Sequence, residues 1–138
     1  MADQIFRKFL GTWALDPASC CYEQGPPPRS AIYHIAQEHD DIVFTMSWVD
    51  ADGEEHKMSF RGPPDGRHVP FEGGQMADAM SIDAFSEREL NTSAYLNRLE
   101  LMVAERILSE DGATMEIRQR VMLADGTRPT NTSTYVRA

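Results

Sequence analysis

The chain has 138 residues, with 13 lysines and arginines against 22 aspartates and glutamates, and a formal net charge of −9. At roughly 100–200 residues per domain, this length predicts one domain over residues 1–138 that buries a core without disulfides or metal. The negative charge argues against nucleic acid and anionic membranes as partners. No apolar stretch approaches the ~20 residues of a membrane span, and residues 1–10 lack a signal-peptide pattern, so we expect a cytoplasmic protein.

The first expected element is a short helical turn near the N-terminus. Asp3 is a candidate cap. The apolar side chains of the turn fall on one side: Ile5, Phe6, Phe9 and Leu10. A helix this short is not stable alone and must pack against other parts of the chain.

The rest of the chain predicts about ten short strands in meander order. Their expected ranges are 9–16, 29–38, 41–50, 54–62, 67–72, 77–85, 88–96, 98–109, 113–123 and 130–137. Turns are expected at residues 39–41, at Gly73-Gly74, and at four Asp-Gly pairs: Asp52-Gly53, Asp65-Gly66, Asp111-Gly112 and Asp125-Gly126. The segment 17–28 is expected to be a loop because it contains three consecutive prolines.

Alternation of apolar and polar residues indicates which side chains face inward. The expected inward sets are Ile42, Phe44, Met46 and Trp48 in 41–50, Leu99, Leu101, Val103, Glu105 and Ile107 in 98–109, and Met115, Ile117, Gln119, Val121 and Leu123 in 113–123. Arg106 falls on the opposite, polar face of its strand. Closure removes exposed strand edges, so the pattern predicts an all-β, closed antiparallel up-and-down barrel of about 8–10 strands.

The segment 9–16, Phe-Leu-Gly-Thr-Trp-Ala-Leu-Asp, opens the first expected strand with Gly-x-Trp. With Ser-Glu-Asp-Gly at 109–112, it resembles the lipocalin and calycin superfamily, and more narrowly small bacterial lipocalin-like proteins. The resemblance implies that Trp13 closes one barrel end and that an arginine of a late strand packs across its ring. Arg137 is the first candidate for that arginine and Arg120 the second. Gly11 permits the bend into the strand, and we expect Gly11 and Trp13 to be structural.

A barrel of this size holds side chains or one small ligand. The candidate ligand-binding residues combine apolar side chains with a few polar ones: Met46, Trp48, Phe60, Leu101, Glu105, Gln119, Tyr135 and Arg137. An arginine beside a tyrosine suits a carboxylate, because a guanidinium bonds two oxygens at once. The alternative is a Glu–Arg pair at the barrel rim that binds no ligand.

Other chemistries find little support in the sequence. The four histidines show no metal-ligand spacing, so neither a metal site nor a cofactor is expected. His34 and His56 are candidates for acid–base chemistry or are ordinary strand residues. The adjacent Cys20 and Cys21 predict reduced thiols, because a disulfide between neighbours requires a strained peptide.

Three hypotheses remain. The leading one is a non-enzymatic lipocalin-like protein that binds a small apolar ligand, with or without a carboxylate, as a monomer or a homodimer. A second is a small barrel enzyme of the cyclase, isomerase or decarboxylase type, in which Glu105, Tyr135 and Arg137 orient a substrate and transfer a proton. The third is an interaction domain whose barrel is filled with side chains. A cavity of roughly 300 Å³ or more favours the first two.

Overall fold

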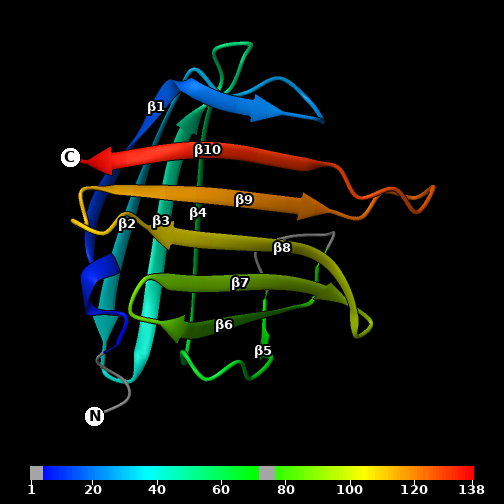
Figure 1. The fold of residues 1–138 in the computed structure, drawn as a ribbon. Helices are drawn as coiled ribbons and strands as arrows, with labels where there is room; N and C mark the ends of the chain where they lie inside the picture. The colour runs from blue at the N-terminus through cyan, green and yellow to red at the C-terminus, as the bar shows by residue number, and fades with distance from the viewer. Residues whose placement is uncertain (1–4, 72–76) are drawn as a thin grey trace.

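The computed structural model describes residues 5–71 and 77–138, and in them the chain forms one antiparallel sheet that curls into a nearly closed barrel (Figure 1). Its strands are β1 (Gly11–Tyr22), β2 (Ser30–Glu38), β3 (Asp41–Val49), β4 (Glu55–Gly62), β5 (Val69–Pro70), β6 (Ala79–Ser86), β7 (Glu89–Leu96), β8 (Leu99–Leu108), β9 (Thr114–Val121) and β10 (Thr130–Arg137). The up-and-down barrel predicted from the alternation is therefore confirmed.

The strand order is β4-β3-β2-β1-β10-β9-β8-β7-β6-β5. Every ladder joins strands consecutive in the chain except β1–β10, which brings the two ends of the sequence together. In Figure 1 the strands β2–β4 run across the direction of β6–β10, and the core lies between these two halves of the sheet. Strands β4 and β5 form the two edges of the sheet and share no ladder in the described residues, so closure is incomplete.

The predicted strand ranges agree with the observed ones to within a few residues, with one clear exception. Strand β1 continues to Tyr22, so the prediction of a loop from residue 17 is wrong for residues 17–22. Pro17 lies where the β1–β10 register shifts between Asp16 and Cys21. A bulge leaves a backbone position without a ladder partner, and it tolerates a residue that has no N–H. Gly73-Gly74 and Asp3 lie outside the described residues.

One end of the barrel is filled by Trp13 and by the 3₁₀ turn Arg7–Phe9. Trp13 is fully buried, and its indole N–H donates to the carbonyl oxygen of Phe9 over 2.9 Å. The guanidinium of Arg137 lies 3.9 Å from the centre of the Trp13 ring and donates to the carbonyl oxygen of Leu10 over 2.7 Å. Arg137 therefore covers Trp13 from the last strand, the arrangement that the lipocalin resemblance implies. In the described residues no helix is long and apolar enough to cross a bilayer.

Gly11 is where the 3₁₀ turn passes into β1, and its backbone has φ +127°. A Cβ at this position would lie 2.9 Å from Nη1 of Arg137. Gly11→Ala is therefore expected to lower the free energy of unfolding by about 1–3 kcal/mol, through backbone strain and displacement of the arginine. Urea unfolding measures the loss. Gly126→Ala is the matched control, because its φ is +86° but nothing lies within 4 Å of the added carbon. An equal loss in both variants would contradict a role for the Arg137 contact.

Candidate functional site

The remainder of the barrel encloses a cavity of about 360 Å³ that Trp13 does not line. Its walls come from both halves of the sheet: Ala31, Ile32, Tyr33, Met46, Ser47, Trp48, Met58 and Phe60 on β2–β4, and Met80, Thr92, Met102, Ala104, Arg106, Gln119 and Tyr135 on β6–β10. Tyr22, Pro26, Pro28 and Asp50 complete the lining. Because Pro26 is exposed, the cavity reaches the surface there, and we call Tyr22, Pro26, Pro28, Trp48 and Asp50 its mouth.

The apolar wall follows from the alternation of β3 and β4. Met46 and Trp48 of β3 point inward, and Met58 lies opposite Met46 in the β3–β4 ladder. Phe60 stacks on Phe44, with ring centres 4.7 Å apart. Small side chains elsewhere in the wall, such as Ala31 and Ala104, leave the volume that larger ones would fill. A cavity of this size favours a ligand-binding barrel over one filled with side chains.

Arg106 of β8 is the charged residue buried in this interior, with a relative exposure of 2%. Its guanidinium carbon lies 4.7 Å from the centre of the Phe44 ring and 5.4 Å from that of Tyr33. Nη1 donates to Oγ1 of Thr92 over 2.9 Å, while the contact from Nη2 to the Tyr33 hydroxyl is longer, at 3.4 Å. Nε has no hydrogen-bond partner. Among the described residues, no acidic side chain forms an ion pair with Arg106.

Burial of the Arg106 guanidinium inside the barrel is costly in free energy. Removing a guanidinium from water costs several kcal/mol even after relaxation. Its contacts with two aromatic faces stabilise the buried guanidinium by about 0.5–2 kcal/mol each, and its one good hydrogen bond contributes about 1.5–3 kcal/mol. Arginine does not escape this cost by losing its proton, because its pKa lies above 12 in proteins. The cavity thus contains a cation whose bonding is incomplete.

Two tyrosines complete the polar part of the cavity. Tyr33 and Tyr135 meet edge to face, with ring centres 5.1 Å apart. Burial, followed by the neighbouring phenols Tyr33 and Tyr22, raises the pKa of Tyr135 far above its ordinary value, and Arg106 opposes this only in part. Burial also raises the pKa of Tyr22. With their pKa values raised, the phenols of Tyr135 and Tyr22 keep their protons at neutral pH and can donate hydrogen bonds.

The inward register predicted for β8 is wrong by one residue. Met102, Ala104 and Arg106 line the cavity, whereas Leu99 is 54% exposed and Leu101 lines a separate surface hollow. The prediction placed the more apolar set inside, as is usual for a packed core. Here the inner face borders a hollow, and Ala104 and Arg106 lie there beside Met102. On the outer face Leu101, Val103 and Ile107 are half-buried. Because both faces of β8 carry apolar residues, no pattern in the sequence could have identified Arg106 as an inward residue.

The predicted polar cluster is divided by the fold. Gln119 and Tyr135 line the cavity as expected. Glu105 does not line it: its carboxylate pairs with Arg120 over 3.2 Å on the outer face. Arg137 does not line it either, because its guanidinium covers Trp13. The enzyme hypothesis therefore loses both the acid and the arginine assigned to it.

The other predicted cavity residues, Met46, Trp48 and Phe60, all lie in the wall. At the mouth Trp48 stacks against His56, with ring centres 5.2 Å apart and an interplanar angle of 19°. Nε2 of His56 lies 2.8 Å from Oδ2 of Asp50. His34, the other strand histidine, lies on the opposite face of β2 from Tyr33 and contacts Oγ1 of Thr12 at 3.0 Å.

The sequence matches no protein-family model and no curated protein. Solved structures do match. A fatty acid binding protein of Schistosoma mansoni in complex with arachidonic acid aligns with TM-score 0.67 and 13% identity, covering 96% of this chain and 98% of that one. An S-type phycobiliprotein lyase of Guillardia theta gives 0.62 and 11%, covering 99% and 92%. Zebrafish ileal bile acid-binding protein with cholic acid gives 0.55 and 15%, covering 95% and 99%.

Proposed function

The chain has a lipocalin-like calycin barrel, and we propose that this barrel binds a small amphiphile with an apolar body and an anionic head, a carboxylate in the simplest case. The observation that carries the proposal is Arg106. It is a buried cation with an unpartnered Nε and no acidic partner among the described residues, inside a cavity of about 360 Å³.

A carboxylate is the head group that meets the needs of Arg106. Its two oxygens accept parallel N–H bonds from the guanidinium fork, and charge-assisted bonds of this kind are about twice as strong as neutral ones. The anion also compensates the buried positive charge, which the fold alone leaves unbalanced. Thr92 and Tyr33 already contact the guanidinium, so their hydroxyls lie close enough to help hold the head group. The head is therefore expected at Arg106 and the apolar body along the wall.

The rest of the cavity suits an apolar body of modest size. Its volume falls at the low end of the 300–1,000 Å³ typical of small-molecule pockets, so it holds one ligand. Met46, Met58, Met80 and Met102 give the wall flexible, polarizable side chains that adapt to ligand shape. Two proteins of similar fold were solved with arachidonic acid and with cholic acid, which are amphiphiles carrying one carboxylic acid group each.

Matched ligands test the proposal. Calorimetric titration of the purified protein with a medium-chain carboxylic acid, the primary alcohol of equal length and the primary amine of equal length isolates the head group. The acid is expected to bind at least about tenfold more tightly than the alcohol, because one charge-assisted bond contributes about 1.5–3 kcal/mol. The amine is expected to bind worst, since it would place a second cation beside Arg106.

Equal affinity for the acid and the alcohol would refute the anionic head, while leaving an apolar ligand in place. Failure of all three to bind would refute the carrier function for chain-like ligands. Native mass spectrometry of protein purified from its source is an independent test. A co-purified ligand whose mass and formula identify it as an acid would support the proposal directly.

A further inference from the structure

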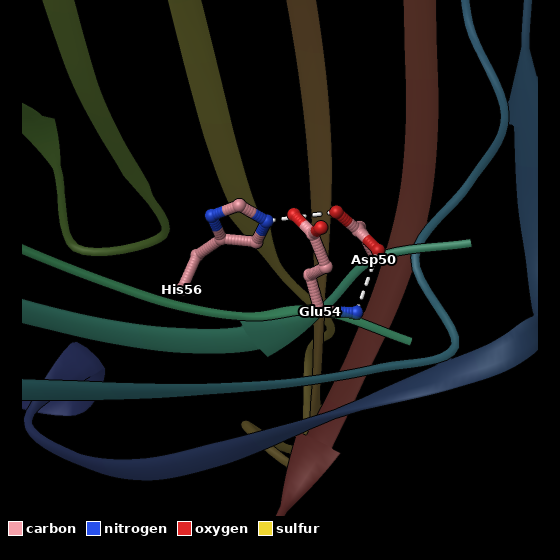
Figure 2. A group of neighbouring side chains, drawn as sticks. All are labelled: Asp50, Glu54 and His56. Carbon is pink, nitrogen blue, oxygen red and sulfur yellow. Dashed lines mark hydrogen bonds and ion pairs between the residues drawn. The ribbon is translucent and has the colours of Figure 1, made fainter. Parts of the chain in front are cut away.

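The hairpin between β3 and β4 places an imidazole and two carboxylates around one point, outside the anion site at Arg106. Asp50, Glu54 and His56 each offer one donor atom, and these three atoms lie within 4.8 Å of one another. Figure 2 shows the ring of His56 and the side chain of Glu54 turned toward Asp50. The sequence predicts no metal site because its histidines lack ligand spacing, but this hairpin gathers donors of two chemical kinds at i, i+4 and i+6.

Two of the three donors are held in place by neighbours. Oδ1 of Asp50 accepts the backbone N–H groups of Asp52 and Glu54, each over 2.9 Å, which leaves Oδ2 directed at Nε2 of His56. The imidazole is held by its stacking on Trp48. Glu54 is exposed and free to adjust.

The carboxylates of this hairpin, Asp50 and Glu54 among them, are not paired with a guanidinium or an ammonium group in the described residues. Arg29, the arginine that contacts the hairpin, donates its Nε to the carbonyl oxygen of Ala51 over 3.1 Å instead. His56 is thus the side-chain partner of Asp50.

We propose that Asp50, Glu54 and His56 form a binding site for one divalent transition-metal ion of the zinc type, with water completing its coordination. One imidazole nitrogen with carboxylate oxygens is a donor set that zinc prefers, whereas calcium and magnesium take oxygen donors alone. Bonds of about 2.0–2.2 Å place tetrahedral ligand atoms about 3.3–3.5 Å apart. The observed separations run from 2.8 Å for Asp50–His56 to at most 4.8 Å, so they bracket that value.

The position of the site links it to the cavity. Asp50 lines the mouth, and His56 stacks on Trp48, which lines it too. A bound ion would therefore place positive charge at the mouth, at a different place from Arg106. This proposal does not depend on the anionic ligand, because the donors belong to the hairpin itself.

Zinc calorimetry on the tag-free protein tests the site directly. One equivalent of Zn²⁺ is expected to bind saturably, and His56→Gln and Glu54→Gln are each expected to weaken binding by at least about tenfold. The matched controls are His34→Gln on β2 and Glu55→Gln beside Glu54, both exposed in the fold and outside the donor set. They are expected to bind zinc as the unmodified protein does. Thermal unfolding of each variant checks that the fold is retained.

A second readout uses the tryptophan beside the site. Ni²⁺ or Co²⁺ held by His56 is expected to quench Trp48, and Trp48→Phe is expected to abolish the quenching while keeping zinc binding in the calorimeter. The absence of saturable zinc binding overturns the proposal. Binding that survives in both His56→Gln and Glu54→Gln also overturns it, because the ion would then lie elsewhere.

Discussion

Arg106→Met is expected to weaken the binding of a medium-chain carboxylic acid by about 10- to 100-fold while leaving the folded protein as stable as before, or more stable. The affinity falls because the substitution removes the charge-assisted bonds to the head group, each worth about 1.5–3 kcal/mol. Stability does not fall with it, since methionine matches the length of the aliphatic stem and removes an uncompensated buried charge. The alcohol of equal length is expected to bind the variant as well as it binds the original protein.

The sign of the stability change separates a binding residue from a structural one. Breaking a buried ion pair by removing one partner costs about 3–5 kcal/mol, but Arg106 has no such partner among the described residues. Urea unfolding and calorimetry with the acid are the two measurements. Arg120→Met is the control, because its guanidinium pairs with Glu105 on the outer face, where such pairs contribute about 0–1 kcal/mol. A loss of several kcal/mol in Arg106→Met would mean that the guanidinium supports the fold.

Trp13→Ala is expected to lower the free energy of unfolding by about 3–5 kcal/mol, a large share of the roughly 5–15 kcal/mol that stabilises a domain. Trp13 is fully buried, its N–H bonds Phe9, and Arg137 lies on its face. Removing it leaves a void at the closed end of the barrel. Trp13→Phe keeps most of the volume and is expected to cost less, about 1–3 kcal/mol, part of it from the lost indole hydrogen bond.

Trp48→Ala is the matched comparison within the same barrel. Trp48 lines the cavity and is half-buried, so its removal enlarges a hollow that is already present. We expect a smaller loss of stability than for Trp13→Ala, together with weaker binding of the apolar body. Denaturant unfolding and ligand titration on both variants give the comparison. Equal destabilisation by the two substitutions would contradict the division between a closed end and a ligand cavity.

The local turn and strand preferences of the amino-acid sequence determined much of the fold of this protein. The Asp-Gly pairs 52–53, 111–112 and 125–126 fall between consecutive strands as predicted, because glycine readily adopts the backbone of a tight turn. The period of two placed Met46 and Trp48 on the inner face of β3, where one side of the strand is plainly more apolar than the other. Gly-x-Trp at 11–13 indicated the closed end of the barrel.

Tertiary structure decided the site. Both faces of β8 carry apolar residues, so the alternation in its sequence does not say which face is inside. Pairing with β7 and β9 set the register that turns Arg106 inward and Glu105 outward. Tyr135 and Arg137 share a face of β10, yet one lines the cavity and the other covers Trp13, because they lie at different depths in the barrel. Periodicity specifies the face of a strand that a residue occupies. Only the closed sheet determines whether that face meets a packed end, a hollow or water.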